Sequence, residues 1–114
     1  MHEMSLAGGI VQLVEAAAQR EQFQKVTLLR LEVGRLSGIE LRALRFALDA
    51  VSPGTCLEGA RFEFDEPPGT AWCLQCNCSV EITDRTDACP QCSGFRLQPT
   101  GGTDLRVIDM LVQD

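Results

Sequence analysis

The chain has 114 residues, 45% of them hydrophobic, which suits one ordinary domain or a small core with an appendage. Its formal net charge of -6 opposes binding to a nucleic-acid backbone. The chain has no apolar run of about 18 residues, so we expect no membrane partner. It also has no basic segment leading into an apolar stretch, which would mark an export signal, and it has six cysteines. Because cytosolic thiols are kept reduced, we expect these cysteines to be metal ligands or buried thiols and the protein to be cytoplasmic.

The first predicted elements are a helix and a strand. Apolar residues recur at helical spacing and predict a helix over residues 4–22. Apolar and charged residues then alternate, which predicts a half-buried strand over residues 25–33 that ends at Gly34.

A second helix and two further strands follow. Residues 37–40 have the Ser-x-x-Glu spacing of a capping box, in which both side chains satisfy free amides at a helix start. A helical apolar stripe comes next and a Pro-Gly pair at 53–54 ends it. Alternating residues predict strands over residues 61–65 and 105–112.

Pro- and Gly-rich segments at 67–69 and 99–102 enclose a stretch of different composition. We therefore predict an α+β fold in which a three-stranded sheet is covered by two helices. Residues 1–67 and 100–114 would form this α/β domain, and residues 68–99 an inserted zinc-ribbon-like module. The pattern does not determine the order of the strands.

Four cysteines carry the strongest chemical signal in the chain. Cys73, Cys76, Cys89 and Cys92 form two Cys-x2-Cys pairs separated by twelve residues, and two such pairs complete a tetrahedron around one Zn²⁺ ion. Four sulfur ligands leave no open position for activating water, so this zinc is predicted to be structural. A redox dithiol and an iron-sulfur centre are the alternatives.

The residues around the pairs support this interpretation. Asn77 and Ser93-Gly94 follow the two pairs at turn positions that tolerate a positive φ. The main large apolar residues of the module are Trp72, Ile82 and Phe95, too few for an independent core. We expect metal binding to supply the missing stability.

Two further cysteines are harder to interpret. Cys78 lies two residues after Cys76 and could replace it as a ligand, or it could be an unligated thiol. Cys56 has no partner nearby in sequence and is predicted to be a small buried apolar residue.

The N-terminus offers a second, different metal site. The Met1 amine, the deprotonated His2 backbone nitrogen and the His2 imidazole can close fused chelate rings in a plane, a geometry that suits Ni²⁺ or Cu²⁺. Glu3 is the local candidate for the fourth ligand. On chemistry alone, a histidine at a frayed terminus is more often a solvated residue than a metal ligand.

Four features of the sequence occur together: the start Met-His-Glu-Met-Ser-Leu, the helix-strand-helix-strand order, Val33-Gly34 before Ile39-Glu40, and the pattern Cys-x2-Cys-x12-Cys-Pro-x-Cys-x-Gly. In this combination the chain resembles the HypA/HybF family of hydrogenase nickel chaperones. The resemblance spans the whole chain. It implies a non-enzymatic nickel metallochaperone that acts with the HypB GTPase to load nickel into [NiFe]-hydrogenase precursors.

Carried over to this sequence, the resemblance implies nickel ligands at Met1, His2 and Glu3 and zinc ligands at the four paired cysteines. Cys78 departs from the family pattern. The chain has no second histidine to complete the nickel square. An inserted module between Pro/Gly segments is compatible with a monomer or with a weak, segment-swapped dimer.

Two other classes of protein fit the sequence less well. A nucleic-acid-binding zinc ribbon would need clustered basic residues, yet only Arg85 and Arg96 are basic between positions 68 and 99. A thiol hydrolase using Cys56 or Cys78 would have no histidine base except His2. A non-enzymatic protein-interaction adaptor remains the alternative. Ni²⁺ binding by the untagged protein distinguishes a nickel chaperone from such an adaptor.

Overall fold

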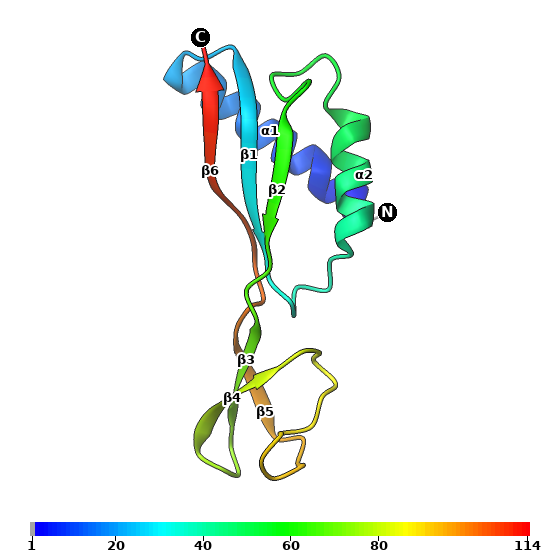
Figure 1. Ribbon diagram of the computed structural model, residues 1–114, viewed down its shortest axis with the longest axis vertical. Coiled ribbons are helices and arrows are strands. Elements are labelled where there is room, and N and C mark those ends of the chain that lie inside the picture. The colour runs from blue at the N-terminus through cyan, green and yellow to red at the C-terminus, as the bar shows by residue number, and fades with distance from the viewer. Residues whose placement is uncertain (1) are drawn as a thin grey trace. The chain divides into compact units, whose positions relative to one another are not determined.

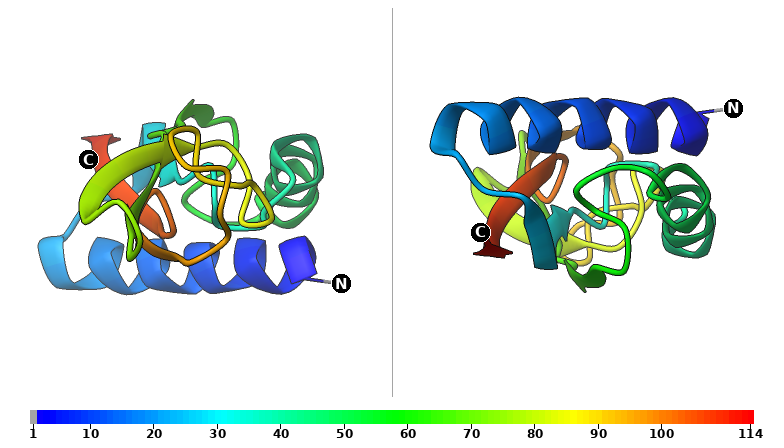
Figure 2. Two further views of the ribbon diagram at one scale, coloured as in Figure 1. Left: turned by 90° about the horizontal axis from the view of Figure 1, so that it is seen from below. Right: turned by 90° about the horizontal axis from the view of Figure 1, so that it is seen from above.

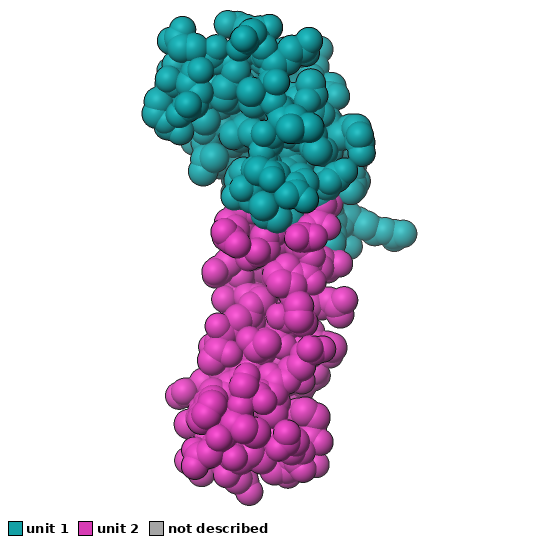
Figure 3. Space-filling model, turned by 60° about the vertical axis from the view of Figure 1, so that its left-hand side comes forward, with its two compact units in different colours: residues 1–31, 39–63, 107–114 teal, residues 32–38, 64–106 magenta. Residues whose placement is uncertain are grey.

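The computed structural model of the protein describes residues 2–114, which fall into two compact units (Figure 3). Unit 1 comprises residues 1–31, 39–63 and 107–114, and unit 2 comprises residues 32–38 and 64–106. No helix in the described part of the chain has the length and apolar character that a membrane span requires.

Two helices belong to unit 1. Helix α1 runs over His2–Glu21, starting two residues earlier than predicted, and α2 runs over Leu41–Val51. The two helices pack against each other, and α1 crosses one face of the sheet (Figures 1 and 2). Their buried residues recur at helical spacing: Ala7, Ile10, Val14, Ala17 and Ala18 in α1, and Leu44, Ala47 and Leu48 in α2.

The start of α2 corrects the capping-box prediction. Glu40, and not Ser37, is the N-cap residue, because its carboxylate accepts a 2.8 Å hydrogen bond from the backbone N–H of Ala43. Gly38 has a φ of 78°, a conformation that a helix cannot contain. The Ser37 N–H instead closes a turn by donating to the Gly34 carbonyl at 3.0 Å.

The predicted three-stranded sheet is present. Its strands are β1 (Lys25–Val33), β2 (Arg61–Asp65) and β6 (Leu105–Gln113), in the order β2-β1-β6. The alternating sequence of β1 therefore forms the central strand. The core of unit 1 contains buried residues of the sheet and of the loops beside it, in addition to those of the two helices. These further residues are Phe23, Val26, Leu29, Leu31, Leu57 and Phe62.

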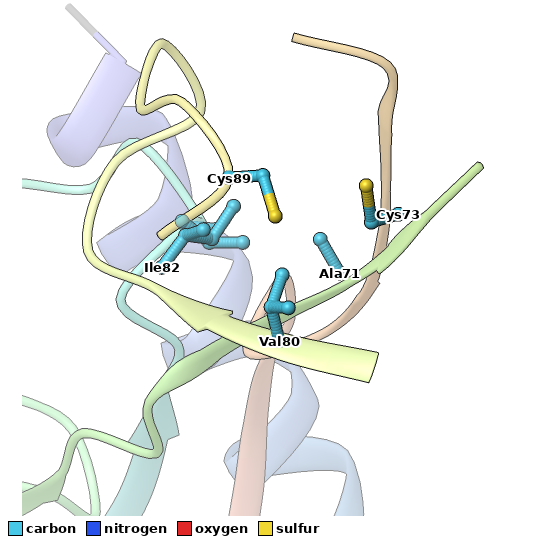
Figure 4. Close-up of a cluster of buried hydrophobic side chains, with 6 residues drawn as sticks. Ala71, Cys73, Val80, Ile82 and Cys89 are labelled. Carbon is cyan, nitrogen blue, oxygen red and sulfur yellow. The ribbon is translucent and has the colours of Figure 1, made fainter. Parts of the chain in front are cut away.

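Unit 2 contains a second three-stranded sheet. Strands β3 (Gly69–Cys73), β4 (Cys78–Ile82) and β5 (Leu97–Gly101) pair antiparallel in the order β4-β3-β5. A small cluster of buried residues lies on one side of it (Figure 4). The cluster consists of Leu36, Ala71, Cys73, Val80, Ile82 and Cys89.

Closely packed backbone holds the segment 32–38 within unit 2. The Gly34 N–H donates to the Asp104 carbonyl at 2.9 Å, and the Leu36 N–H donates to the Gly102 carbonyl at 2.7 Å. A Cβ at Gly34 would collide with the carbonyl of Gly102. Gly102 has a φ of 72°, and a Cβ there would collide with the Pro68 carbonyl, so both positions require glycine.

Candidate metal centres

Unit 2 brings together the four cysteines that the sequence singled out. The sulfur atoms of Cys73, Cys76, Cys89 and Cys92 all lie within 4.8 Å of one another. The Cys73–Cys92 and Cys76–Cys89 sulfur pairs are 3.7 and 3.9 Å apart. A tetrahedron with zinc–sulfur bonds of about 2.3 Å has edges of about 3.8 Å, so the four thiols fit a zinc ion.

The two Cys-x2-Cys turns have the same backbone construction. The Asn77 N–H donates to the Cys73 carbonyl at 2.8 Å, and the Ser93 N–H donates to the Cys89 carbonyl at 2.8 Å. Asn77 and Ser93 adopt positive φ values of 56° and 63°, which confirms the expectation for these positions. Each turn therefore reverses the chain and points both of its sulfur atoms to the same side.

Backbone amides also point at the sulfur atoms. The Cys76 N–H donates to the Cys73 sulfur at 3.3 Å, and the Gln91 N–H donates to the Cys89 sulfur at 3.4 Å. Backbone amides of Cys92 and Gln91 lower the pKa of the Cys89 thiol to about 7. By contrast, a hydrogen bond between the Cys76 and Cys92 side chains raises the pKa of the Cys76 thiol. Four thiolates this close together repel one another, so full ionisation needs a bound cation.

The apolar contribution to unit 2 is small. Of the three apolar residues singled out in the sequence of the module, only Ile82 is buried, while Trp72 is 38% and Phe95 74% exposed. Cys73 and Cys89 are themselves among the buried residues of the cluster. The cysteines occupy the position that larger hydrophobic side chains have in an ordinary core.

The remaining two cysteines lie outside the four-sulfur group. Cys78 packs beside it, but its thiol points to the side-chain oxygen of Gln91 at 3.5 Å, and Cys76 occupies the fourth corner. Cys56 is buried as predicted, with its backbone N–H donating to Glu15 at 3.2 Å. Burial raises the pKa of the Cys56 thiol, and so this thiol is a poor nucleophile.

The predicted nickel ligands lie at the start of α1. Met1 is outside the described residues, and the His2 side chain is exposed. A Glu3 carboxylate oxygen accepts a 3.2 Å hydrogen bond from the backbone N–H of Glu40, the N-cap of α2. This bond lowers the pKa of the Glu3 carboxyl, so a negative charge is held one residue away from His2.

Sequence reasoning missed the contact between Glu3 and Glu40, because 37 positions separate the two residues along the chain. The one feature of the sequence that pointed to this contact was Glu40, the acidic residue before the second apolar stripe. Within residues 2–114, the four cysteines are the one group of three or more potential metal-ligating side chains close together.

The fold and the four-thiol group define an α+β protein with a zinc-ribbon-like metal-binding module. The model of the family described as "Hydrogenase/urease nickel incorporation, metallochaperone, hypA" matches residues 1–112. The chain belongs to this family. It is accordingly a metallochaperone that takes part in hydrogenase maturation, and not an enzyme.

Individual relatives agree with this assignment. The chain is 65% identical over 114 residues to the hydrogenase maturation factor HypA of Cupriavidus necator, covering 100% of this chain and 96% of the relative. It is 54% identical to HypA of Azotobacter vinelandii over 113 residues, covering 99% and 100%. The solution structure of the Ni metallochaperone HypA from Helicobacter pylori shares the fold, with a TM-score of 0.70, 16% identity and 97% of each chain covered.

Proposed function

We propose that this protein binds one Ni²⁺ ion at its N-terminus as cargo and delivers it, with a HypB-type GTPase, to [NiFe]-hydrogenase precursors. The single observation that carries the proposal is the match of residues 1–112 to a nickel-incorporation metallochaperone family. The N-terminal His2-Glu3 pair on an exposed first helical turn supports the location of the cargo site.

The proposed nickel ligands are the Met1 amine, the His2 backbone nitrogen, the His2 imidazole and a group from Glu3. Nitrogen ligands in a plane suit Ni²⁺ and disfavour Zn²⁺, which prefers a tetrahedron. The ionised Glu3 carboxylate adds negative charge beside His2, which favours a divalent cation. Geometry would thus separate the nickel cargo from zinc.

Exposure suits the site to transfer. His2 lies at the surface, so a receiving protein can approach the metal from the open side and exchange ligands one at a time. A fully enclosed site would oppose release. The small number of terminal ligands favours exchange over permanent retention.

The second metal is a structural Zn²⁺ ion held by Cys73, Cys76, Cys89 and Cys92. Its support is the tetrahedral spacing of the four sulfur atoms. Four protein ligands close the coordination shell, which suits a scaffold and excludes cargo that must be released. Reduced thiols of this kind are maintained in the cytoplasm, where we place the protein.

The cargo site can be tested by titrating untagged protein with Ni²⁺ and monitoring binding by calorimetry and visible absorption. Metal analysis measures the zinc content of the same samples. Wild-type protein should bind one Ni²⁺ with the absorption of a planar complex. His2→Ala, and a variant with one extra residue before Met1, should lose that absorption and bind at least about tenfold more weakly, because a chelate ring is removed. Both should keep one zinc.

A matched control is Cys78→Ala, which should leave both metals in place because Cys78 is outside the four-sulfur group. Unchanged nickel stoichiometry and absorption in His2→Ala would contradict the proposed site. Wild-type protein that binds no Ni²⁺ would instead favour the adaptor alternative.

A further inference from the structure

Cys78 is the fifth thiol of unit 2, and it faces one of the proposed zinc ligands across the β3–β4 ladder. Cys73 and Cys78 are opposite each other in the register of this antiparallel pair, two positions along from Ala71 and Val80. Opposite residues point to the same face of a sheet, and every second pair shares that face. Ala71 and Val80 belong to the buried cluster (Figure 4), so Cys73 and Cys78 lie on the cluster's side of the sheet.

The two residues are close enough to be joined by a disulfide. Cys78 packs against the buried cluster, of which Cys73 is a member. Opposite Cα atoms in an antiparallel ladder are about 4.5–5.5 Å apart, and disulfides join Cα atoms that are about 4.4–6.8 Å apart. The Cys78 thiol donates to the side-chain oxygen of Gln91 at 3.5 Å, and rotation about its Cα–Cβ bond turns it toward Cys73. The strands themselves need not separate.

The register distinguishes Cys73 from the other three proposed ligands. Cys76 lies in the turn between β3 and β4, and Cys89 and Cys92 belong to the second Cys-x2-Cys turn, so none of them takes part in this ladder. The Asn77 N–H donates to the Cys73 carbonyl at 2.8 Å and closes the turn that joins the two strands. A short, closed turn keeps the entropic cost of joining its ends small. Cys73 is therefore the ligand that the fold places ready to pair with the fifth thiol.

The two thiols differ in their access to solvent. Cys73 is fully buried, and its sulfur atom occupies one corner of the four-sulfur group. Cys78 is partly exposed and lies outside that group, so a zinc ion would not shield its sulfur atom. Oxidation of cysteine depends on exposure as well as on thiolate character. A small dissolved oxidant would therefore react at Cys78 first.

We propose that Cys73 and Cys78 form an oxidation site, at which hydrogen peroxide creates a disulfide and thereby releases the zinc ion. The proposal rests on the structural zinc site of the proposed function and goes beyond its cargo role. First, the Cys78 thiol attacks peroxide and the O–O bond breaks, which gives a sulfenic acid and one water molecule. The Cys73 thiolate then attacks the Cys78 sulfur atom, the S–O bond breaks and hydroxide leaves. Peroxide gains two electrons, and each sulfur atom supplies one.

The disulfide would open the zinc site. A sulfur atom in a disulfide is no longer a thiolate ligand, so three thiolates would remain and the closed tetrahedral shell would be lost. The buried cluster of unit 2 is too small to replace the metal, because it has only Leu36, Val80 and Ile82 as large aliphatic residues. Unit 2 would then hold its zinc only while the pair is reduced.

The experiment uses untagged, full-length protein that metal analysis shows to hold one zinc. Hydrogen peroxide is added at one equivalent per chain, and zinc release is followed with a chromogenic chelator. Thiols are alkylated in denaturant, the protein is reduced, and a second reagent marks the cysteines that had been oxidised. Wild-type protein should release its zinc and lose two of its six thiols, with the second label at Cys73 and Cys78. Reduction in the presence of Zn²⁺ should restore the zinc content.

Two variants separate the proposed pair from general thiol oxidation. Cys78→Ala should hold one zinc but release it at least about tenfold more slowly after peroxide is added, because its other sulfur atoms in unit 2 are all ligands. Cys56→Ala is the matched control, since it also removes a cysteine outside the four-sulfur group, but in unit 1. It should release zinc at the wild-type rate and lose the same two thiols.

Several outcomes would overturn the proposal. One is zinc release from Cys78→Ala at the wild-type rate. Another is a disulfide that maps to other cysteines or joins two chains. Zinc that stays bound while Cys73 and Cys78 remain reduced would refute the oxidation site and leave the structural zinc assignment intact. Untagged protein that holds no zinc before oxidation would refute the zinc assignment together with the proposed release, whereas Ni²⁺ titration tests the cargo site separately.

Discussion

Unit 1 and unit 2 have cores of different kinds. In unit 1, two helices and a sheet bury large aliphatic side chains such as Leu29, Leu44 and Leu48, all of which are fully excluded from solvent. In unit 2, the buried cluster contains only Leu36, Val80 and Ile82 as large aliphatic residues, and cysteines complete it. The first core can be stabilised by hydrophobic burial, whereas the second needs cross-linking by a metal.

The two proposed metal sites differ in the same way. The four thiols of unit 2 are partly or fully buried and surround a closed tetrahedral position. The proposed cargo ligands of unit 1 are at the exposed start of a helix. A buried, four-sided site favours retention of its ion, and an exposed terminal site favours exchange. The comparison predicts that substitutions will affect the two sites independently.

The largest predicted effect is the loss of unit 2 after removal of one zinc ligand. Cys73→Ala should abolish zinc binding, because Cys73 is fully buried and three thiols leave the shell open. Structural zinc contributes about 10–16 kcal/mol in isolated modules, more than the small cluster can replace. Metal analysis and the fluorescence of Trp72, the single tryptophan, would report the change.

Helical circular dichroism should persist in Cys73→Ala, since both helices belong to unit 1. Cys78→Ala is the matched control and should retain one zinc. If Cys78→Ala lost the zinc and Cys76→Ala kept it, the assignment of the fourth ligand would be reversed.

An intermediate effect is expected at the close backbone contact of unit 2. Gly102→Ala should destabilise unit 2 by at least about 2 kcal/mol, because it combines a positive φ with a collision against the Pro68 carbonyl. Gly38→Ala is the matched control in the same unit, since Gly38 has a φ of 78° but open space around it. It should have an effect of about 1 kcal/mol.

Denaturant unfolding of the zinc-loaded variants, followed by Trp72 fluorescence, compares these two substitutions. If Gly102→Ala and Gly38→Ala lower the free energy of unfolding equally, the positive φ angle alone matters and the contact at Pro68 can relax.

The smallest effect is expected at the link between α1 and α2. The Glu40 N–H lowers the folded-state pKa of the Glu3 carboxyl below 4.5, so the bond's stabilising contribution is present above the unfolded-state pKa. The contribution should disappear as pH falls through the lowered, folded-state pKa. Carboxyl NMR titration should give a midpoint below 4.5 for Glu3.

Glu3→Gln should speed hydrogen exchange of the Glu40 amide near neutral pH, whereas Glu21→Gln, at the other end of α1, should not. A Glu3 midpoint at or above 4.5 would show that the hydrogen bond does not form in solution.

Much of the local structure could be predicted because it depends on local patterns. The bounds predicted for β1 and β2 match those observed, since alternating apolar residues report directly which side of a strand is buried. The start of α2 was predicted wrongly. Ser37 and Glu40 have capping-box spacing, but the positive φ of Gly38 breaks the helical geometry between them. Spacing alone does not reveal a backbone angle.

Contacts between distant parts of the chain could not be predicted. The segment 32–38 precedes a helix of unit 1, yet Leu36 is buried in the cysteine cluster of unit 2. Glu3 likewise reaches Glu40 across 37 positions. No sequence period records such pairings, because each arises from packing between separate elements.

By itself, the sequence identified the paired thiols at fixed spacing as a candidate metal site, and it predicted a second site at His2 that stays a prediction. The tertiary structure decided which sulfur atoms meet. It places Cys76 in the tetrahedral group and turns Cys78 toward Gln91. It also leaves Phe46 and Phe95 in solvent, because a side chain's exposure depends on what the rest of the fold packs against it.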